Sequence, residues 1–237
     1  MNKIIVLCLL GDPMLTPASI PGTGGFNVDS ADLINILNGT PYDVIFITNY
    51  SFAGQPEYEK LTSNIELYRI KFEDGSLQDQ NLLIKQIDRI MRQIEGVISS
   101  FDSVFLLHGL YWLSGYIAAR LSAIYQIPFI YTPVSLAYNK IHAEVAPKCR
   151  LQEEWEKFFL PKASLILSIT DSEKEILTTY YGVDTSKIIV LGRHGASLKS
   201  QTFAQPDKES ELSAYNEKLN LTHQTWHIKA FTFIGRF

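Results

Sequence analysis

Hydrophobic and polar positions along the chain follow two periodicities in turn. Short apolar runs rich in β-branched residues predict buried strands, and apolar residues three or four positions apart predict amphipathic helices. The predicted strands are Lys3–Leu10, Asp43–Thr48, Ile65–Phe72, Ser103–His108, Ile127–Thr132, Ala163–Ile169 and Lys187–Leu191. The predicted helices are one that begins near Asn27, followed by Asn81–Ile98, Ser114–Tyr125, Arg150–Phe159 and Ser172–Tyr181.

This alternation of strands and helices predicts the fold class α/β, a Rossmann-like parallel sheet with helices on both faces. The pattern changes after Phe203, where the sequence becomes polar before a last apolar run near the C-terminus. We therefore expect a domain at 1–203, a linker at 204–229 and, at 230–237, the first strand of a further domain.

A glycine-rich turn, Pro21-Gly-Thr-Gly-Gly25, precedes the first helix. Glycines allow a ligand to approach the backbone closely, and a helix N-terminus offers unpaired N–H groups to phosphate. A turn that merely needs glycine is the alternative. The dinucleotide-binding fingerprint fails because Asn27 stands where its third glycine should be, and no Walker lysine follows. A dehydrogenase is therefore disfavoured.

Composition excludes several other classes of protein. The formal net charge of -4 and pI of about 5.7 argue against a nucleic-acid partner. No apolar run is long enough for a transmembrane helix, and the histidines lack metal-ligand spacing. With only two cysteines, Cys8 and Cys149, we expect a soluble cytoplasmic protein without disulfide, metal or cofactor.

Candidate chemistry lies just after the predicted strands, since ligands of parallel sheets bind at the carboxyl ends of strands. The segments at these ends are Gly22–Asn27, His108–Gly115, Thr132–Ser135, Thr170–Glu173 and Gly192–Gly195. His108 is either a base or a buried core histidine. Thr170 and Glu173 have the spacing of a helix capping box, which is the favoured interpretation of that pair. No Ser-His-Asp order or G-x-S-x-G elbow is present.

A set of ordered segments carries a resemblance to a known family. They are Gly24-Gly-Phe-Asn-Val28, His108-Gly-Leu-Tyr-Trp-Leu-Ser-Gly115, Thr132-Pro-Val-Ser-Leu-Ala-Tyr-Asn-Lys140, Ala163-Ser-Leu-Ile-Leu-Ser-Ile-Thr-Asp-Ser-Glu173, Tyr181-Gly-Val-Asp-Thr-Ser-Lys-Ile188 and Phe233-Ile-Gly-Arg236. Together they resemble the N-terminal, acceptor-side domain of the retaining family-4 glycosyltransferases of GT-B fold. The similarity is greatest to the sucrose-phosphate synthase and mycothiol glycosyltransferase group, whose acceptors carry a phosphate.

The resemblance implies roles for individual residues. Gly24, Gly25 and Arg236 would contact the diphosphate of a nucleotide-sugar donor. The acceptor, a small sugar or sugar phosphate, would be bound by Asn27, His108, Tyr111, Ser135, Lys140 and Arg150. Ordinary alternatives exist: Arg150 pairs with Glu153 or Glu154 on its own helix, and Tyr111 belongs to the core.

Two departures from the family pattern bear on activity. Val134 stands where the family has a histidine, and valine can neither donate nor accept a hydrogen bond. The family's lysine after the Gly-Arg pair and the paired glutamates of its donor domain are missing from residues 1–237, and Gln78 lies near where an acceptor-phosphate lysine is expected. One hypothesis is therefore a glycosyltransferase that is incomplete as this chain alone. The other is an inactive domain that binds a sugar phosphate or a partner protein, and a partner chain or dimer is also expected to cover an exposed interdomain face.

Overall fold

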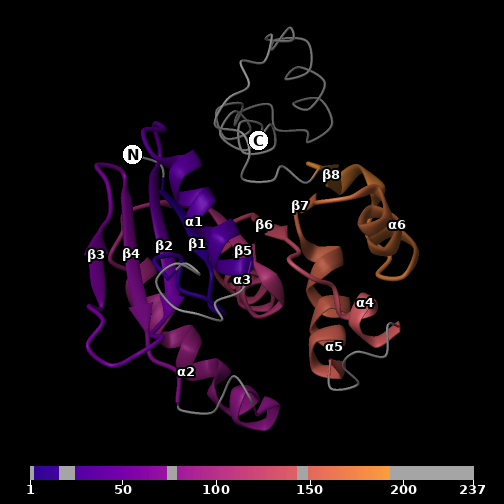
Figure 1. Cartoon of the computed structure of the whole chain (residues 1–237), viewed down its shortest axis with the longest axis horizontal. Helices are drawn as coiled ribbons and strands as arrows, with labels where there is room; N and C mark the ends of the chain where they lie inside the picture. The colour runs from indigo at the N-terminus through magenta and orange to yellow at the C-terminus, as the bar shows by residue number, and fades with distance from the viewer. Residues whose placement is uncertain (1–2, 16–24, 74–78, 143–148, 193–237) are drawn as a thin grey trace, which may run out of the picture.

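In the computed structural model, residues 3–15, 25–73, 79–142 and 149–192 are described. Over these residues, eight strands form one mixed sheet in the order β3-β4-β2-β1-β5-β6-β7-β8, which Figure 1 shows from left to right. The strands are β1 (Lys3–Leu7), β2 (Asp43–Asn49), β3 (Tyr58–Lys60), β4 (Ile65–Ile70), β5 (Val104–Leu110), β6 (Phe129–Thr132), β7 (Leu165–Ser168) and β8 (Ile188–Val190). All neighbouring pairs are parallel except β3 and β4, which are antiparallel.

The helices connect the parallel strands. They are α1 (Gly25–Leu37), α2 (Gln80–Ile98), α3 (Tyr111–Tyr125), α4 (Ala137–His142), α5 (Arg150–Phe159) and α6 (Asp171–Thr179), with short 3₁₀ turns at Leu160–Lys162 and Thr185–Lys187. Among these described helices, none has the length and apolar character needed to cross a membrane.

The predicted α/β fold class is confirmed, and each predicted strand and helix within the described residues is present. Two elements were missed. β3 has only three residues and is a half-exposed edge strand, and α4 has only six residues, so neither is long enough to show a periodicity. The predicted linker at 204–229 and the strand at 230–237 lie outside the described residues.

Several strands are shorter than predicted, such as β1, which ends at Leu7 and not at Leu10, and the predicted junction between β5 and α3 is wrong. The strand expected to end at His108 continues to Leu110, and the helix expected from Ser114 begins at Tyr111, so no loop separates them. Gly109 and Gly115 explain the tight junction, because a Cβ on Gly109 would lie only 2.9 Å from the Gly115 Cα and backbone nitrogen. The backbone of β5 therefore approaches that of α3 as closely as two glycines permit.

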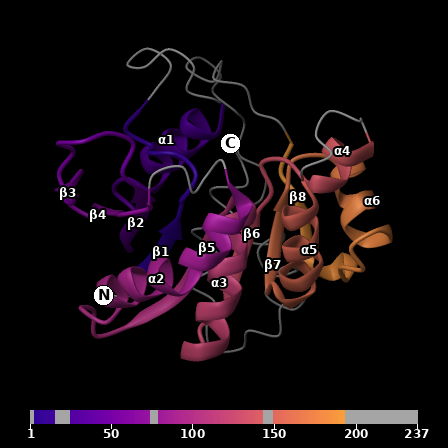
Figure 2. The same cartoon turned by 90° about the horizontal axis from the view of Figure 1, so that it is seen from below.

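Helices cover both faces of the sheet, as predicted (Figure 2). α1 packs over β1, β2, β4 and β5 on one face, through Leu33, Ile34 and Leu37. α2, α3, α5 and α6 contribute to a larger core on the other face, together with the residues of β1 that alternate with those of the first face. Because side chains of a strand alternate between faces and both faces are covered, β1 is apolar and buried from Ile4 to Leu7.

The capping interpretation of Thr170 and Glu173 is confirmed. The Thr170 hydroxyl accepts from the Glu173 backbone nitrogen at 3.1 Å, and the Glu173 carboxylate accepts from Ile169 N at 2.8 Å. These contacts fix the start of α6, so the pair has a structural role.

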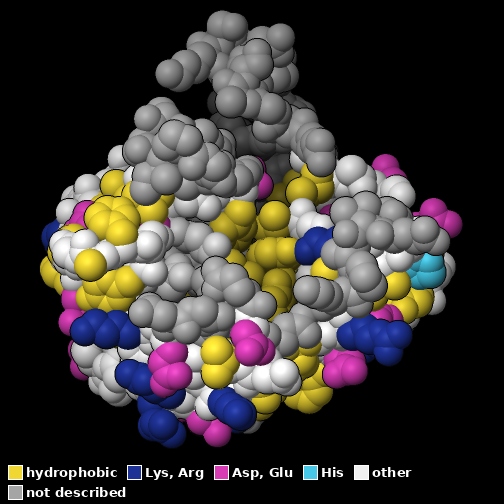
Figure 3. Space-filling model, turned by 60° about the horizontal axis from the view of Figure 1, so that its bottom comes forward, with side chains coloured by type: hydrophobic (Ala, Val, Ile, Leu, Met, Phe, Trp, Pro, Cys, Tyr) yellow, Lys and Arg dark blue, Asp and Glu magenta, His cyan; other side chains and the backbone are white. Residues whose placement is uncertain are grey.

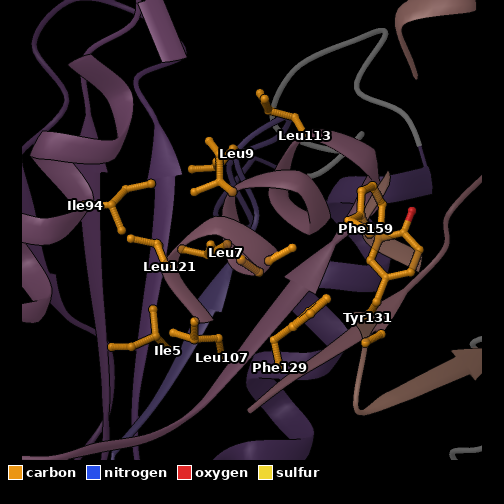
Figure 4. Packing of buried hydrophobic residues seen from close by; sticks show 14 of the residues in the cluster. Ile5, Leu7, Leu9, Ile94, Leu107, Leu113, Leu121, Phe129, Tyr131 and Phe159 are labelled. Atoms are coloured by element: carbon orange, nitrogen blue, oxygen red, sulfur yellow. The ribbon is translucent and has the colours of Figure 1, made fainter. Parts of the chain in front are cut away.

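Tyr131 of β6 and Phe159 of α5 pack edge to face in the larger core, with ring centroids 4.8 Å apart (Figure 4). Both side chains are fully buried. Among the residues that the structure describes, the Tyr131 hydroxyl has no hydrogen-bond partner. A buried hydroxyl without a partner is unfavourable because it loses its hydrogen bonds to water.

We therefore expect Tyr131→Phe to raise the free energy of unfolding by about 1 kcal/mol. Urea denaturation of the full chain measures this change. Tyr181→Phe is the matched control, because the Tyr181 hydroxyl donates to the buried Glu156 carboxylate at 2.6 Å. Losing that bond should lower stability by about 1–2 kcal/mol, so the same substitution has opposite signs at the two positions. A loss of stability in Tyr131→Phe would contradict the prediction.

Candidate functional site

The strand order identifies where a ligand of this sheet would bind. β1 and β5 are adjacent, and the chain leaves β1 for α1 on one face but leaves β5 for α3 on the other. This reversal is the topological switch point of a doubly wound sheet, where a crevice opens at the carboxyl ends of the strands. The residues after β1 and β5 are therefore the ones to consider first.

The segment after β1 is held by a buried ion pair. Asp12 is fully buried, and its Oδ2 accepts from Arg69 Nε of β4 at 2.7 Å and from Gln55 Nε2 at 2.7 Å. The other carboxylate oxygen accepts from Met14 N at 2.9 Å. Arg69 is 3% exposed and also contacts Glu59 of β3. The pair thus connects the sheet edge to the segment after β1.

Asn27, in the first turn of α1, secures the same segment from the other side. Its Nδ2 donates to the backbone oxygens of Asp12 and Leu15, both at 2.9 Å. A Cβ on Gly11 would lie 2.5 Å from Asn27 Oδ1, so this approach requires glycine. Asn27 is 8% exposed, and its amide nitrogen is engaged by the backbone. Its contact with an acceptor remains a prediction.

Gly25 is the first residue of α1, close to where the glycine-rich turn was expected to place a helix start. The first turn of α1 contains no acidic residue. Backbone N–H groups at a helix N-terminus are a common seat for phosphate, and this is the physical basis of the role predicted for Gly25. Gly24, like Arg236, lies outside the described residues, and its role remains a prediction.

Tyr111 occupies the switch point in a strained conformation. It is the first residue of α3 and has φ 69°, in the left-handed region that a bulky side chain rarely adopts. Its ring lies 6.0 Å from that of Phe26 in α1, so the side chain extends from β5 toward the helix on the opposite face. Strain of this kind often accompanies a functional constraint.

Lys140 of α4 meets Tyr111 from the other side. Its Nζ hydrogen-bonds to the Tyr111 hydroxyl and to Gln152 Oε1, the latter at 3.0 Å. Both Tyr111 and Lys140 are half-buried. A hydroxyl and an ammonium group thus lie side by side at the carboxyl ends of β5 and β6, where an anionic group could take the place of their mutual contact.

Ser135 belongs to the same cluster through its backbone, because its carbonyl accepts from Gln152 Nε2 at 2.8 Å. Gln152 also donates to Glu156, which lies one turn further along α5. Glu156 is fully buried, and burial raises the pKa of its carboxyl group to about 7 although hydrogen bonds from Tyr181, Gln152 and Ala137 oppose the shift. Arg150, at the start of α5, is exposed.

Gln152 and Glu156 were missed in the sequence. They lie four residues apart on the inward face of α5, between the buried Leu151 and Phe159. The signal in the sequence was a polar residue at two positions of α5 where the helical period predicts apolar residues.

His108 is 1% exposed, and its Nε2 lies 2.8 Å from the Thr132 hydroxyl. Burial lowers the pKa of the imidazole to about 3, so the ring is neutral at physiological pH. Of the two interpretations, the buried core histidine agrees with these surroundings, and contact with an acceptor remains a prediction. Val134, after β6, is half-buried.

The surface drawn in Figure 3 is hollowed near its centre, where hydrophobic side chains gather beside a basic one. A concave, mainly apolar surface with a few polar groups is the usual form of a small-molecule site.

Fold and strand order define this protein as a GT-B-like α/β domain. The sucrose-phosphate synthase from Thermosynechococcus elongatus superposes with a TM-score of 0.70 over 82% of this chain and 49% of its own, at 16% sequence identity. The model of the glycosyl transferase 4-like domain matches residues 24–194. The chain belongs to this glycosyl transferase 4-like family.

Curated relatives are similar over the same region. The D-inositol 3-phosphate glycosyltransferase of Paenarthrobacter aurescens (strain TC1) is 26% identical over 189 residues, which are 74% of this chain and 45% of that protein. The enzyme of the same name from Corynebacterium kroppenstedtii (strain DSM 44385) is 24% identical over 241 residues, covering 99% of this chain and 51% of its own length. The chain thus spans about half the length of the curated relatives it matches.

Proposed function

We propose that this chain is the acceptor-side half of a retaining glycosyltransferase that transfers a sugar from a nucleotide-diphosphate donor to a small phosphorylated acceptor. The observation that carries the proposal is the contact between Tyr111 and Lys140 at the switch point of the sheet. The names of the relatives support it, since D-inositol 3-phosphate carries both a phosphate and acceptor hydroxyl groups.

In the proposed reaction, an acceptor hydroxyl oxygen forms a bond to the anomeric carbon of the donor sugar. The bond from that carbon to the diphosphate oxygen breaks with its electron pair, and the proton of the acceptor passes to the departing diphosphate. Backbone N–H groups at Gly25 would stabilise the charge that develops on the diphosphate. Arg236 would add a positive charge there, and donor contacts beyond Phe237 are part of the same proposal.

On the acceptor side, the Tyr111 hydroxyl and the Lys140 ammonium would bind the phosphate. A phosphate oxygen that enters between them exchanges one contact within the protein for two charge-assisted hydrogen bonds. Ser135 lies within the same cluster and Arg150 at the start of the helix that forms its wall, so both remain proposed contacts.

The experiment is calorimetric titration of the full chain with D-inositol 3-phosphate and with unphosphorylated inositol. We expect the phosphorylated compound to bind more tightly, and Lys140→Met to weaken its binding by roughly tenfold to a hundredfold, since a hydrogen bond to a charged group contributes about 1.5–3 kcal/mol. Inositol binding should change little.

Lys157→Met is the matched control. It removes the same charge from an exposed lysine that pairs with Glu153 on the outer side of α5. Equal binding of the two inositol compounds by the unmodified chain, or an equal effect of the two lysine substitutions, would contradict an acceptor-phosphate site.

A second candidate function rests on Val134. If the missing histidine abolishes transfer, the domain binds a sugar phosphate without acting on it. Phosphate-dependent binding by the chain, combined with absence of sugar transfer after a donor domain has been supplied and restoration of transfer by Val134→His, would favour this alternative.

A further inference from the structure

The inward face of α5 carries a buried carboxylate and a buried amide. Glu156 is 0% exposed and Gln152 is 3% exposed. Burying such groups is unfavourable unless hydrogen bonds replace those to water. The hydrogen-bond partners of Glu156 and Gln152 therefore indicate what the two side chains do.

Within the described part of the chain, the Glu156 carboxylate accepts hydrogen bonds from three donors. Oε2 accepts from the Ala137 backbone nitrogen at 2.9 Å and from the Tyr181 hydroxyl at 2.6 Å, while Oε1 accepts from Gln152 Nε2 at 2.6 Å. Because an ionised carboxylate only accepts hydrogen bonds, this set of partners suits its charged form.

This arrangement fixes which end of the Gln152 amide faces each neighbour. The amide nitrogen has two acceptors, the Glu156 carboxylate and the Ser135 carbonyl, on its side. The amide oxygen must then point the other way, where it accepts from Lys140 Nζ at 3.0 Å. A rotated amide would direct N–H groups at an ammonium, which has no acceptor to offer.

We propose that Glu156 and Gln152 are positioning residues for the acceptor-phosphate site. The buried carboxylate orients the amide of Gln152, and the amide oxygen holds the Lys140 ammonium beside the Tyr111 hydroxyl. The lysine side chain has four rotatable bonds, so an acceptor group at its end selects the conformation that serves the site. This inference rests on the proposed function, because Gln152 and Glu156 can position Lys140 for the acceptor phosphate only if Lys140 binds that phosphate.

The test compares the affinities of the full chain for D-inositol 3-phosphate and inositol, measured by calorimetry at pH 8, where Glu156 is largely ionised. We expect Glu156→Gln to reduce the preference for the phosphorylated compound by roughly tenfold, the equivalent of one hydrogen bond to a charged group. Gln152→Leu should have the same effect, and it keeps the proposal testable if Glu156→Gln does not fold.

A rescue variant separates positioning from a merely structural role. In the double variant Gln152→Glu with Glu156→Gln, the carboxylate at position 152 accepts from Lys140 and also from the amide at position 156. We expect it to recover much of the preference that Glu156→Gln loses. Tyr181→Phe, which removes a different donor from Glu156, should destabilise the fold and leave the preference unchanged.

The outcomes separate this inference from the proposed function. If the unmodified chain shows no preference for the phosphorylated compound, both are wrong. If the preference depends on Lys140 but survives Gln152→Leu and Glu156→Gln, the acceptor site stands and the positioning role is refuted. If the double variant is no better than Glu156→Gln, or Tyr181→Phe loses the preference equally, α5 supports the fold only and the inference is also refuted.

Discussion

Replacing Arg69 with methionine is expected to lower the free energy of unfolding by about 3–5 kcal/mol, because it leaves the buried Asp12 carboxylate without its positive partner. Asp12 is fully buried, and Arg69 Nε lies 2.7 Å from its Oδ2. Methionine fills similar space but cannot compensate the charge. Urea denaturation of the full chain measures the loss.

Two controls isolate the effect of burial. Arg89→Met removes an arginine whose ion pair with Glu73 is about half exposed, and it should cost less than about 1 kcal/mol. The double variant Asp12→Asn with Arg69→Met removes both charges, so it should be more stable than Arg69→Met alone. A small loss in Arg69→Met, or a double variant that is less stable still, would contradict a charge-compensating role.

The pair also shows why parts of the site could not be predicted from the sequence. Asp12 and Arg69 are 57 positions apart, and neither belongs to a local motif. Only the parallel pairing of β2 with β4, and of β1 with β2, brings them together. Interactions set by the sheet register become visible when the topology is known.

The fold itself was predictable because its signals are local. The inward residues Leu83, Ile87 and Ile94 of α2 repeat at the helical period, and β1 is apolar after Lys3 because both of its faces are covered. The junction at Tyr111 was predicted incorrectly because two glycines usually indicate a loop, whereas here they allow a strand and a helix to touch.

For the site, the resemblance placed Tyr111, Ser135 and Lys140 on one ligand, and the structure brings these three residues into one cluster. It could not indicate their supports. Gln152 and Glu156 are proposed to act through Lys140, and the evidence for them lies in burial and hydrogen bonding rather than in a motif.

The second large effect is expected at Gly115, in the first turns of α3. A Cβ there would lie 2.6 Å from Cε2 and Cζ of Phe159 and 2.7 Å from Cε2 of Tyr131. Both rings are fully buried and pack against each other, so neither can move aside without disturbing the larger core. Gly115→Ala should therefore destabilise the protein by about 2–3 kcal/mol, although alanine is the better helix former.

Gly96→Ala in α2 is the matched control, because a Cβ there meets nothing within 4 Å. The same substitution should raise the stability by about 0.5–1 kcal/mol. Helix propensity favours alanine at both positions, so a loss of stability at Gly115 alone reports the packing clash. A stability change of the same sign in both variants would refute the packing argument. Gly115→Ala also tests how the core supports the site: a shift of α3 away from Phe159 carries Tyr111 with it, so binding of D-inositol 3-phosphate should weaken even under conditions where the variant remains folded.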